Sequence, residues 1–306
     1  MKLDVIGDVH GQYDKLTSLL RHLGYGESAG AWRHPERTAI FVGDLIDRGP
    51  KQLQTVDLVR AMVESGSARC VMGNHEFNAV AWATPDPKKA GRFLRPHSKR
   101  GNRKQHHAFL KEVEGTHRHA EVIAWFKTLP MWLDLGAVRI VHACWHQASM
   151  DLLRPLLGPQ QTLTDEVLER GSRRGDEIFD AIEVVCKGPE IRLPDGIFFA
   201  DKEGKVRHEV RVHWWQQNLT TYRNAAMVAR AEDALIPDMP LPAQWAGFHY
   251  EGPPVFFGHY WFSGTPAVLS SQFACLDYSA ARNGPLVAYR WDGEPSLSSE
   301  KLAWVS

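Results

Sequence analysis

Gly7-Asp8-Val9-His10-Gly11 is the first of three short loops near the start of this chain that decide its fold. The other two are Gly43-Asp44-Leu45-Ile46-Asp47-Arg48-Gly49 and Gly73-Asn74-His75-Glu76. Each loop follows a short apolar run, at residues 3–6, 39–42 and 70–72. Such runs predict buried parallel strands, and the leading glycine allows a sharp turn at the carboxyl end of each strand.

The polar side chains of these loops should meet at one edge of the predicted sheet, because ligands bind at the carboxyl ends of parallel strands. The loops offer carboxylate, amide, imidazole and guanidinium groups: Asp8, His10, Asp44, Asp47, Arg48, Asn74 and His75. Oxygen and nitrogen metal ligands beside a guanidinium and a spare imidazole favour metal-assisted phosphoester hydrolysis.

The wider pattern predicts an α/β protein with insertions. Helical spacing over 13–23 and 53–63, between the strand-and-loop units, predicts a parallel sheet with crossover helices. Further helices are predicted at 120–129 and near 161–187 and 219–234, and a hairpin should turn at Gly136. Short strands at 255–257, 267–269, 273–277 and 286–291 are predicted to form antiparallel sheet edges.

The composition of the 306 residues is that of a globular protein, with 43% hydrophobic residues and 36 basic against 36 acidic side chains. This balance predicts no obligate nucleic-acid partner, and no apolar stretch reaches the ~20 residues of a membrane span. The four cysteines lack Cys-x-x-Cys spacing, and the first strand starts almost at once. We therefore expect reduced thiols, no signal peptide and a cytoplasmic location.

The three loops resemble the signature of the calcineurin-like metallophosphoesterases, most closely the branch of the Ser/Thr protein phosphatases and symmetrical diadenosine tetraphosphatases. Two later segments fit the same signature, Ile140-Val141-His142-Ala143 and Phe256-Phe257-Gly258-His259. The resemblance implies a four-layer α-β-β-α sandwich with two central mixed sheets. It predicts a single metallophosphoesterase domain over 1–306, with a basic insertion at about 84–118 and an insertion or cap at about 146–250.

The resemblance also implies two adjacent divalent metal ions and a bridging water that becomes the attacking hydroxide. Asp8 and His10 would bind the first ion, Asp44 would bridge both, and the second ion would take Asn74, His142 and His259. Mixed oxygen and imidazole ligands suit Mn, with Fe or Zn as alternatives. As an alternative role, Asp8 and Asp44 each precede a helix and are favoured N-caps.

Catalytic roles follow from the same resemblance. Arg48 would bind the phosphate, and His75 would act as the general acid with Asp47 orienting its ring. A second phosphate-binding arginine is expected in the middle region, where Arg211 is the candidate, with Arg192 and Arg223 as alternatives. For single residues, a surface ion pair or a hydrogen-bonded loop histidine is the competing interpretation.

Two features depart from the family pattern. In many members the last motif is a Gly-His-x-His loop, whereas this chain has Trp261 in place of the second histidine. The protein-phosphatase branch also lacks this second histidine. Cys144 and Trp145 replace the usual glycines after His142, which indicates either a stacking surface or core packing.

Between residues 88 and 104 lie eight basic and no acidic residues. This segment is either a solvated face or a surface that steers a multiply charged substrate.

The leading functional hypothesis is a two-metal phosphoesterase that hydrolyses phosphomonoesters, on a phosphoprotein or a small phosphate. A dinucleoside polyphosphate or nucleotide phosphodiester hydrolase is the alternative, favoured by the basic segment and the tryptophans. A non-catalytic scaffold with this fold is a third hypothesis, disfavoured because the ligand residues and His75 are all present.

Overall fold

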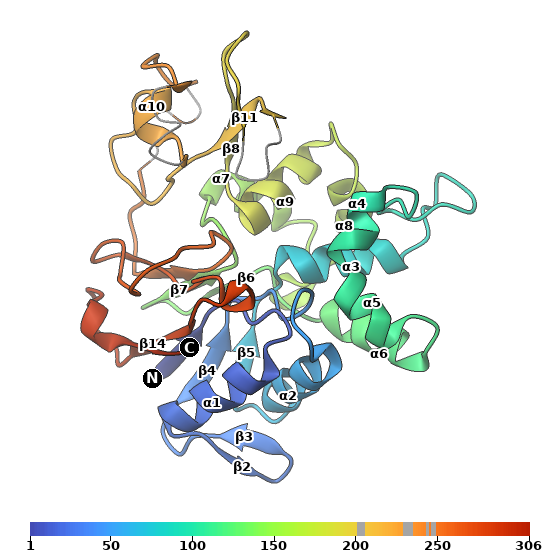
Figure 1. Cartoon of the computed structure of the whole chain (residues 1–306), viewed down its shortest axis with the longest axis vertical. Helices are drawn as coiled ribbons and strands as arrows, with labels where there is room; N and C mark the ends of the chain where they lie inside the picture. The colour runs from blue at the N-terminus through green and yellow to red at the C-terminus, as the bar shows by residue number, and fades with distance from the viewer. Residues whose placement is uncertain (201–205, 229–234, 243–244, 246–248) are drawn as a thin grey trace. The chain divides into compact units, whose positions relative to one another are not determined.

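The computed structural model describes residues 1–200, 206–228, 235–242, 245 and 249–306. The chain forms two compact units, residues 1–186 with 253–306, and residues 187–252. The motif loops all belong to the first unit (Figure 1). Among the described residues, none of the helices combines the length and apolar character needed to cross a bilayer.

The first sheet has the strand order β15-β14-β1-β4-β5. Its strands are β1 (Leu3–Ile6), β4 (Thr38–Phe41), β5 (Ala68–Cys70), β14 (Leu286–Trp291) and β15 (Leu302–Val305). β1, β4 and β5 are parallel, whereas β14 pairs antiparallel with β1 and β15. Helices α1 (Tyr13–Leu23) and α2 (Gln52–Glu64) pack against this sheet (Figure 1). The predicted parallel strands and crossover helices are confirmed.

The second sheet has the order β13-β12-β7-β6. Its strands are β6 (Trp132–Asp134), β7 (Arg139–Val141), β12 (Val255–Phe257) and β13 (Phe273–Cys275). The hairpin of β6 and β7 is confirmed, but β12 is parallel to both β7 and β13, so the predicted antiparallel edge is wrong here. The reason is the connection over residues 258–272, which is long enough for a parallel crossover.

The strand predicted at 267–269 is also wrong. The backbone N–H of Ala267 donates to the Tyr278 hydroxyl, and that of Val268 donates to Ser299 Oγ. These two N–H groups therefore bond to side chains and not to a neighbouring strand. The local sequence cannot predict this, because the partners Tyr278 and Ser299 are distant in the chain.

The main core lies between the two sheets. Buried side chains from both sheets form one cluster, with Val5 and Ile40 from the first sheet beside Ile140 and Phe256 from the second. Two mixed sheets that share one core, with α1 and α2 packed against the first sheet, confirm the predicted α/β sandwich. Because the two sheets pack on a shared core, loops that leave the strands of both sheets can meet at one edge of the sandwich.

The first unit also contains elements outside the sheets. They are α3 (Asn74–Ala83), α4 (Arg100–Gln105), α5 (His107–Val113), α6 (His117–Phe126), α7 (Gln147–Leu153), α8 (Asp165–Gly171), α9 (Glu177–Lys187, whose last residue begins the second unit), a hairpin of β2 (Gly26–Ser28) and β3 (Ala31–Arg33), and the 3-10 turns η1 (Pro159–Gln161), η3 (Ala280–Arg282) and η4 (Ser299–Lys301). The helices predicted at 120–129 and near 161–187 are confirmed as α6, α8 and α9.

The second unit has small two-stranded pairings. They join β8 (Glu190–Arg192) to β11 (Glu209–Arg211) and β9 (Phe199–Ala200) to β10 (Val206–Arg207), and α10 (Tyr222–Ala225) follows. The helix predicted near 219–234 is wrong beyond Ala225, because Ala226 is extended and bridges to Val212. Its last part, 229–234, lies outside the described residues.

Arg37 stabilises the first sheet at the amino end of β4. Its Nε donates to the fully buried Asp4 at 2.9 Å, and its Nη2 donates to the carbonyls of Leu3 and Trp291. We expect Arg37→Leu to lower the free energy of unfolding by about 3 kcal/mol. The buried Asp4 loses one of its two arginine partners, the other being Arg290, and two backbone carbonyls lose a donor. Urea unfolding measures this change. Glu36→Gln, at an exposed ion pair with Lys2, should cost less than about 1 kcal/mol, and equal losses would contradict the prediction.

Candidate functional site

Five loops from the two sheets meet at one edge of the first unit. Those after β1, β4 and β5 come from the first sheet, and those after β7 and β12 come from the second. Two glycines allow the loops to approach closely. A Cβ on Gly73 would lie 2.2 Å from Asp44 Oδ1, and one on Gly258 would lie 1.9 Å from Asp8 Oδ1. Any side chain at either position would displace a candidate ligand.

Several residues on these loops have a left-handed backbone conformation that side chains disfavour. Positive φ angles occur at His10 (47°), Asp44 (51°), Asp47 (71°), Arg48 (72°) and His259 (72°). Each such conformation costs on the order of 1 kcal/mol and persists only where the surrounding structure enforces it. The strain therefore coincides with the residues that the motifs single out.

Asp44 lies between two groups of candidate metal ligands. One group is His10, Asp44 and His75, and the other is Asp44, His142 and His259, all of them buried. Asp44 Oδ2 is 3.6 Å from His10 Nε2, and Asp44 Oδ1 is 3.3 Å from His142 Nε2. The two carboxylate oxygens thus face different histidines, as a bridging ligand requires.

The donor atoms around Asp44 fit cations. His142 Nδ1 donates to the Val42 carbonyl at 2.7 Å, so its Nε2 faces the oxygens of Asp44, at 3.3 Å, and of Asn74, at 3.1 Å. A neutral imidazole lone pair would be repelled there unless a cation lay between the atoms. Although burial opposes the charge, the neighbouring Asp44 carboxylate raises the pKa of His142 to about 10.

His10 shows the same arrangement on the other side of Asp44. Its Nδ1 donates to the Ile46 carbonyl at 2.8 Å, and its Nε2 is buried without a hydrogen-bond partner. Burial and the adjacent His75 lower the pKa of His10 to about 3, so the ring is neutral and presents a lone pair. A histidine whose second nitrogen bonds a carbonyl is the usual form of a metal ligand.

Two further predicted ligands lie beside these groups. Asn74 Oδ1 accepts from His259 Nδ1 at 2.8 Å. Asp8 belongs to neither group, but its Oδ2 accepts from the His259 backbone N–H at 3.1 Å and its Oδ1 is buried without a hydrogen-bond partner. Burial and the nearby Asp277 raise the pKa of Asp8 well above its ordinary value. A cation there would satisfy the carboxylate.

Glu76 organises the Asp44 loop, a role that the sequence analysis did not assign. Its carboxylate accepts the backbone N–H groups of Asp44 and Leu45 at 2.8 Å and of Gly73 at 3.0 Å. Burial and the charge of Asp44 raise the pKa of Glu76 to about 7. The spacing of Gly73 and Glu76 at a helix start resembles a capping box and could have indicated this role.

The predicted acid and its partner are in contact. His75 Nδ1 is 2.5 Å from Asp47 Oδ2, and Arg48 Nη2 is 3.5 Å from His75 Nε2. His75 Nε2 also lies 3.7 Å from Asp44 Oδ2, so its free nitrogen faces the metal groups. Burial would raise the pKa of Asp47, but hydrogen bonds from His106 and His75 lower it, and Asp47 is therefore ionised.

His106 is a second histidine on Asp47, and the sequence analysis missed it. Its Nδ1 is 2.8 Å from Asp47 Oδ2 and its side chain is fully buried. The preceding Gln105 lies 3.4 Å from His75 Nδ1 and accepts from Arg95. The basic insertion therefore contacts the site through Gln105 and His106, at the end of α4. No motif in the sequence predicts this contact.

We expect His106→Leu to lower kcat for phenyl phosphate about tenfold with little change in KM, because Asp47 loses the partner that fixes it. His106→Asn should recover most of the loss, since its amide N–H can replace the Nδ1 donor. His107→Leu, at the exposed neighbouring histidine, serves as control. Equal losses in the Leu and Asn variants would exclude a positioning role.

The basic segment itself has mixed surroundings. Arg103 forms an ion pair with Glu114, and Lys88 pairs with Glu169 at 2.8 Å. Arg95 donates to Asn78 and is partly buried. The remaining basic residues are exposed: Lys89, Arg92, Lys99, Arg100 and Lys104. Part of the predicted steering surface is therefore neutralised by partners within the first unit.

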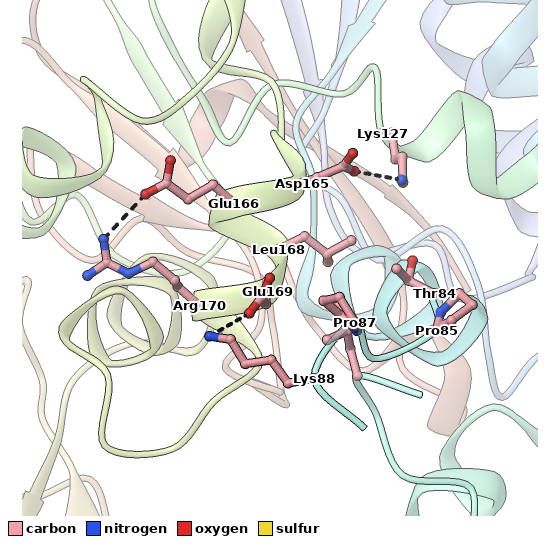
Figure 2. A pocket seen from close by; sticks show the side chains of 11 residues that line it. Thr84, Pro85, Pro87, Lys88, Lys127, Asp165, Glu166, Leu168, Glu169 and Arg170 are labelled. Atoms are coloured by element: carbon pink, nitrogen blue, oxygen red, sulfur yellow. Dashed lines mark hydrogen bonds and ion pairs between the residues drawn. The ribbon is translucent and has the colours of Figure 1, made fainter. Parts of the chain in front are cut away.

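A pocket lies at the far end of α3 from Asn74 (Figure 2). Thr84 and Pro85 line it beside α8, and its cations are paired: Lys88 with Glu169, Lys127 with Asp165, and Arg170 with Glu166. The ten residues of α3 separate it from the metal groups by about 15 Å of helix. Because its cations are compensated, we assign it no anionic ligand.

Arg211 belongs to the second unit, where its Nε lies 3.4 Å from Glu190 in β8. Its role in phosphate binding stays a prediction. Trp145 is buried and stacks with Arg139 of β7, its ring centre 4.7 Å from the guanidinium carbon. Of the two interpretations of Trp145, core packing is the one that this burial supports.

A comparison with known protein families agrees with the family resemblance of the motif loops. Residues 1–148, just under half of the chain, match the family described as calcineurin-like phosphoesterase. This part of the chain is therefore similar in sequence to the calcineurin-like phosphoesterases. It contains all three motif loops and His142.

The chain is similar to curated proteins named bis(5'-nucleosyl)-tetraphosphatase PrpE (asymmetrical). It is 51% identical to that of Geobacillus sp. (strain WCH70) over 76 residues, which are 24% of this chain and 31% of that protein. With the Oceanobacillus iheyensis protein it shares 29% identity over 144 residues, 47% of this chain and 55% of the other. The chain thus spans about a third to a half of the length of these relatives.

A solved structure of a cold-active protein tyrosine phosphatase is also similar. It matches with a TM-score of 0.53 at 16% identity, and the match covers 96% of this chain and 77% of that one. At this identity the likeness concerns the fold alone.

Proposed function

We propose that this chain is a metal-dependent phosphoric ester hydrolase that cleaves dinucleoside polyphosphates. The observation that supports hydrolysis best is the Asp44 carboxylate, whose two oxygens face two groups of buried histidines. The tetraphosphatase names of its relatives favour this substrate over the phosphomonoester placed first by the sequence analysis.

Two divalent ions, with Mn as the first candidate, would supply an activated water and neutralise charge on the phosphoryl oxygens. His10, Asp44, Asn74, His142 and His259 would hold them, with Asp8 beside them. The oxygen of water bonds to phosphorus and one phosphoanhydride P–O bond breaks.

The remaining site residues would act on the substrate directly. Arg48, exposed at the edge of the site, would donate to phosphoryl oxygens. His75 would give the proton on Nε2 to the leaving oxygen, and Asp47 holds Nδ1 so that Nε2 faces the metal groups. The cytoplasmic location stays a prediction from cysteine use.

A substrate panel with Mn²⁺ tests this function. It comprises diadenosine tetraphosphate, a phosphoserine peptide, a cyclic nucleotide and 4-nitrophenyl phosphate. We expect the highest kcat/KM for diadenosine tetraphosphate, with ATP and AMP as products if the chain acts asymmetrically. A higher kcat/KM for the phosphopeptide would restore the phosphomonoesterase hypothesis, and metal binding without any turnover would indicate a scaffold.

A further inference from the structure

Trp261 contacts two arginines from different parts of the first unit. The guanidinium carbon of Arg48 lies 3.4 Å from the centre of the indole ring, and that of Arg282 lies 4.5 Å from it. Both distances fall within the range of cation–π contacts. Trp261 therefore holds Arg282, which follows β13, close to the phosphate-binding residue expected from the motifs.

The backbone around Trp261 is built to hold this arrangement. Trp261 has a φ of 55°, a conformation that non-glycine residues rarely adopt. The buried Asp277 accepts from the Trp261 N–H at 2.8 Å and from the Ser279 N–H at 2.9 Å. Ser279 directly precedes η3, which ends at Arg282, so one carboxylate fixes both the ring and the turn beside it.

The pair of arginines adjoins the candidate metal site. The Trp261 ring centre is 5.9 Å from that of His10, and Arg48 Nη2 is 3.5 Å from His75 Nε2. Arg48 and Arg282 are both exposed, so both can meet a ligand from solvent. An anion that contacts both guanidinium groups would be attracted by both positive charges.

We propose that Arg282, positioned by Trp261, is a second phosphate-binding residue selecting substrates that carry a chain of phosphates. The inference rests on the proposed function, because Arg48 is taken to bind the phosphate that reacts. On this proposal a single phosphate is held by Arg48, whereas a polyphosphate extends past the indole to Arg282. Guanidinium groups suit this role because their N–H donors match phosphate oxygens in pairs.

Arg282→Gln tests the proposal. A lost charge-assisted hydrogen bond is worth about tenfold in binding, so we expect KM for diadenosine tetraphosphate to rise about tenfold. KM for 4-nitrophenyl phosphate should stay within about twofold. Arg21→Gln is the matched control. Arg21 is exposed near the carboxyl end of α1, and its guanidinium group also stacks on a tryptophan, Trp32.

Inorganic tripolyphosphate separates this inference from the proposed function. It should inhibit 4-nitrophenyl phosphate hydrolysis, and Arg282→Gln should raise its inhibition constant about tenfold while leaving that of orthophosphate unchanged. This arm decides the role of Arg282 even if diadenosine tetraphosphate is not a substrate. Equal tripolyphosphate inhibition of the parent and the Arg282→Gln protein would overturn the proposal.

Discussion

Asp44→Asn is expected to reduce bound metal from two ions per chain to one or none and to lower kcat/KM on the order of 10³-fold. The amide keeps the size of the side chain but removes the charge that both histidine groups face. Metal ions contribute several kcal/mol to the stabilisation of a phosphoryl transition state, which corresponds to this factor. Elemental analysis of the purified protein and steady-state kinetics with Mn²⁺ measure the two effects.

The control for this prediction is Asp14→Asn, which removes an exposed carboxylate on α1 that pairs with Lys51. It should leave metal content and kcat/KM unchanged. Circular dichroism of both variants checks that the fold survives. Two bound ions and full activity in Asp44→Asn would remove Asp44 from the bridging role and with it the proposed centre.

His75→Ala is expected to keep the bound metal but to lower kcat for phenyl phosphate on the order of 10²-fold. For 4-nitrophenyl phosphate the loss should be about tenfold or less, because this leaving group departs without a proton. The ratio of the two losses isolates proton donation from general damage to the site. Kinetics with both esters, at saturating Mn²⁺, provide the measurement.

The structure also gives His75 a competing role, because its Nε2 lies 3.7 Å from Asp44 Oδ2 within a candidate metal group. If His75 were a ligand, the Ala variant would lose metal, and the two esters would suffer equally. Glu112→Ala is unsuitable as a control because Glu112 caps α2 near the site, accepting from the Gln52 and Leu53 N–H groups. His22→Ala, at the exposed far end of α1, is the suitable one.

The sequence predicted individual helices and strands well where the pattern of apolar residues was clear. β1, α1 and β14 have the predicted bounds, because short apolar runs in the strands and helical apolar spacing in α1 continue along their length. The direction of β12 relative to β13 could not be predicted, since it depends on how the chain between them crosses the sheet. Pairing of distant strands leaves no mark on local hydrophobicity.

The candidate site divides in the same way. Asp44, His142 and His259 lie in recognisable strand-end motifs, and the structure brings them together. His106 and Arg282 lie in segments without such motifs, and only tertiary packing places them beside Asp47 and Trp261. Reasoning from motifs finds the residues that lie within the strand-end loops, Asp47 and Arg48 included, and it misses residues that reach the site from other segments.

The antiparallel pairing of β1 with β14 has a consequence for biosynthesis. β1 is synthesised well before residues 286–291, which form its neighbour on one side, and well before His259. During translation, the nascent polypeptide therefore exposes an unpaired edge of β1 until β14 has been synthesised. A chain truncated before β14 would keep this edge exposed and aggregate readily, and the candidate metal site cannot form before His259 has been synthesised.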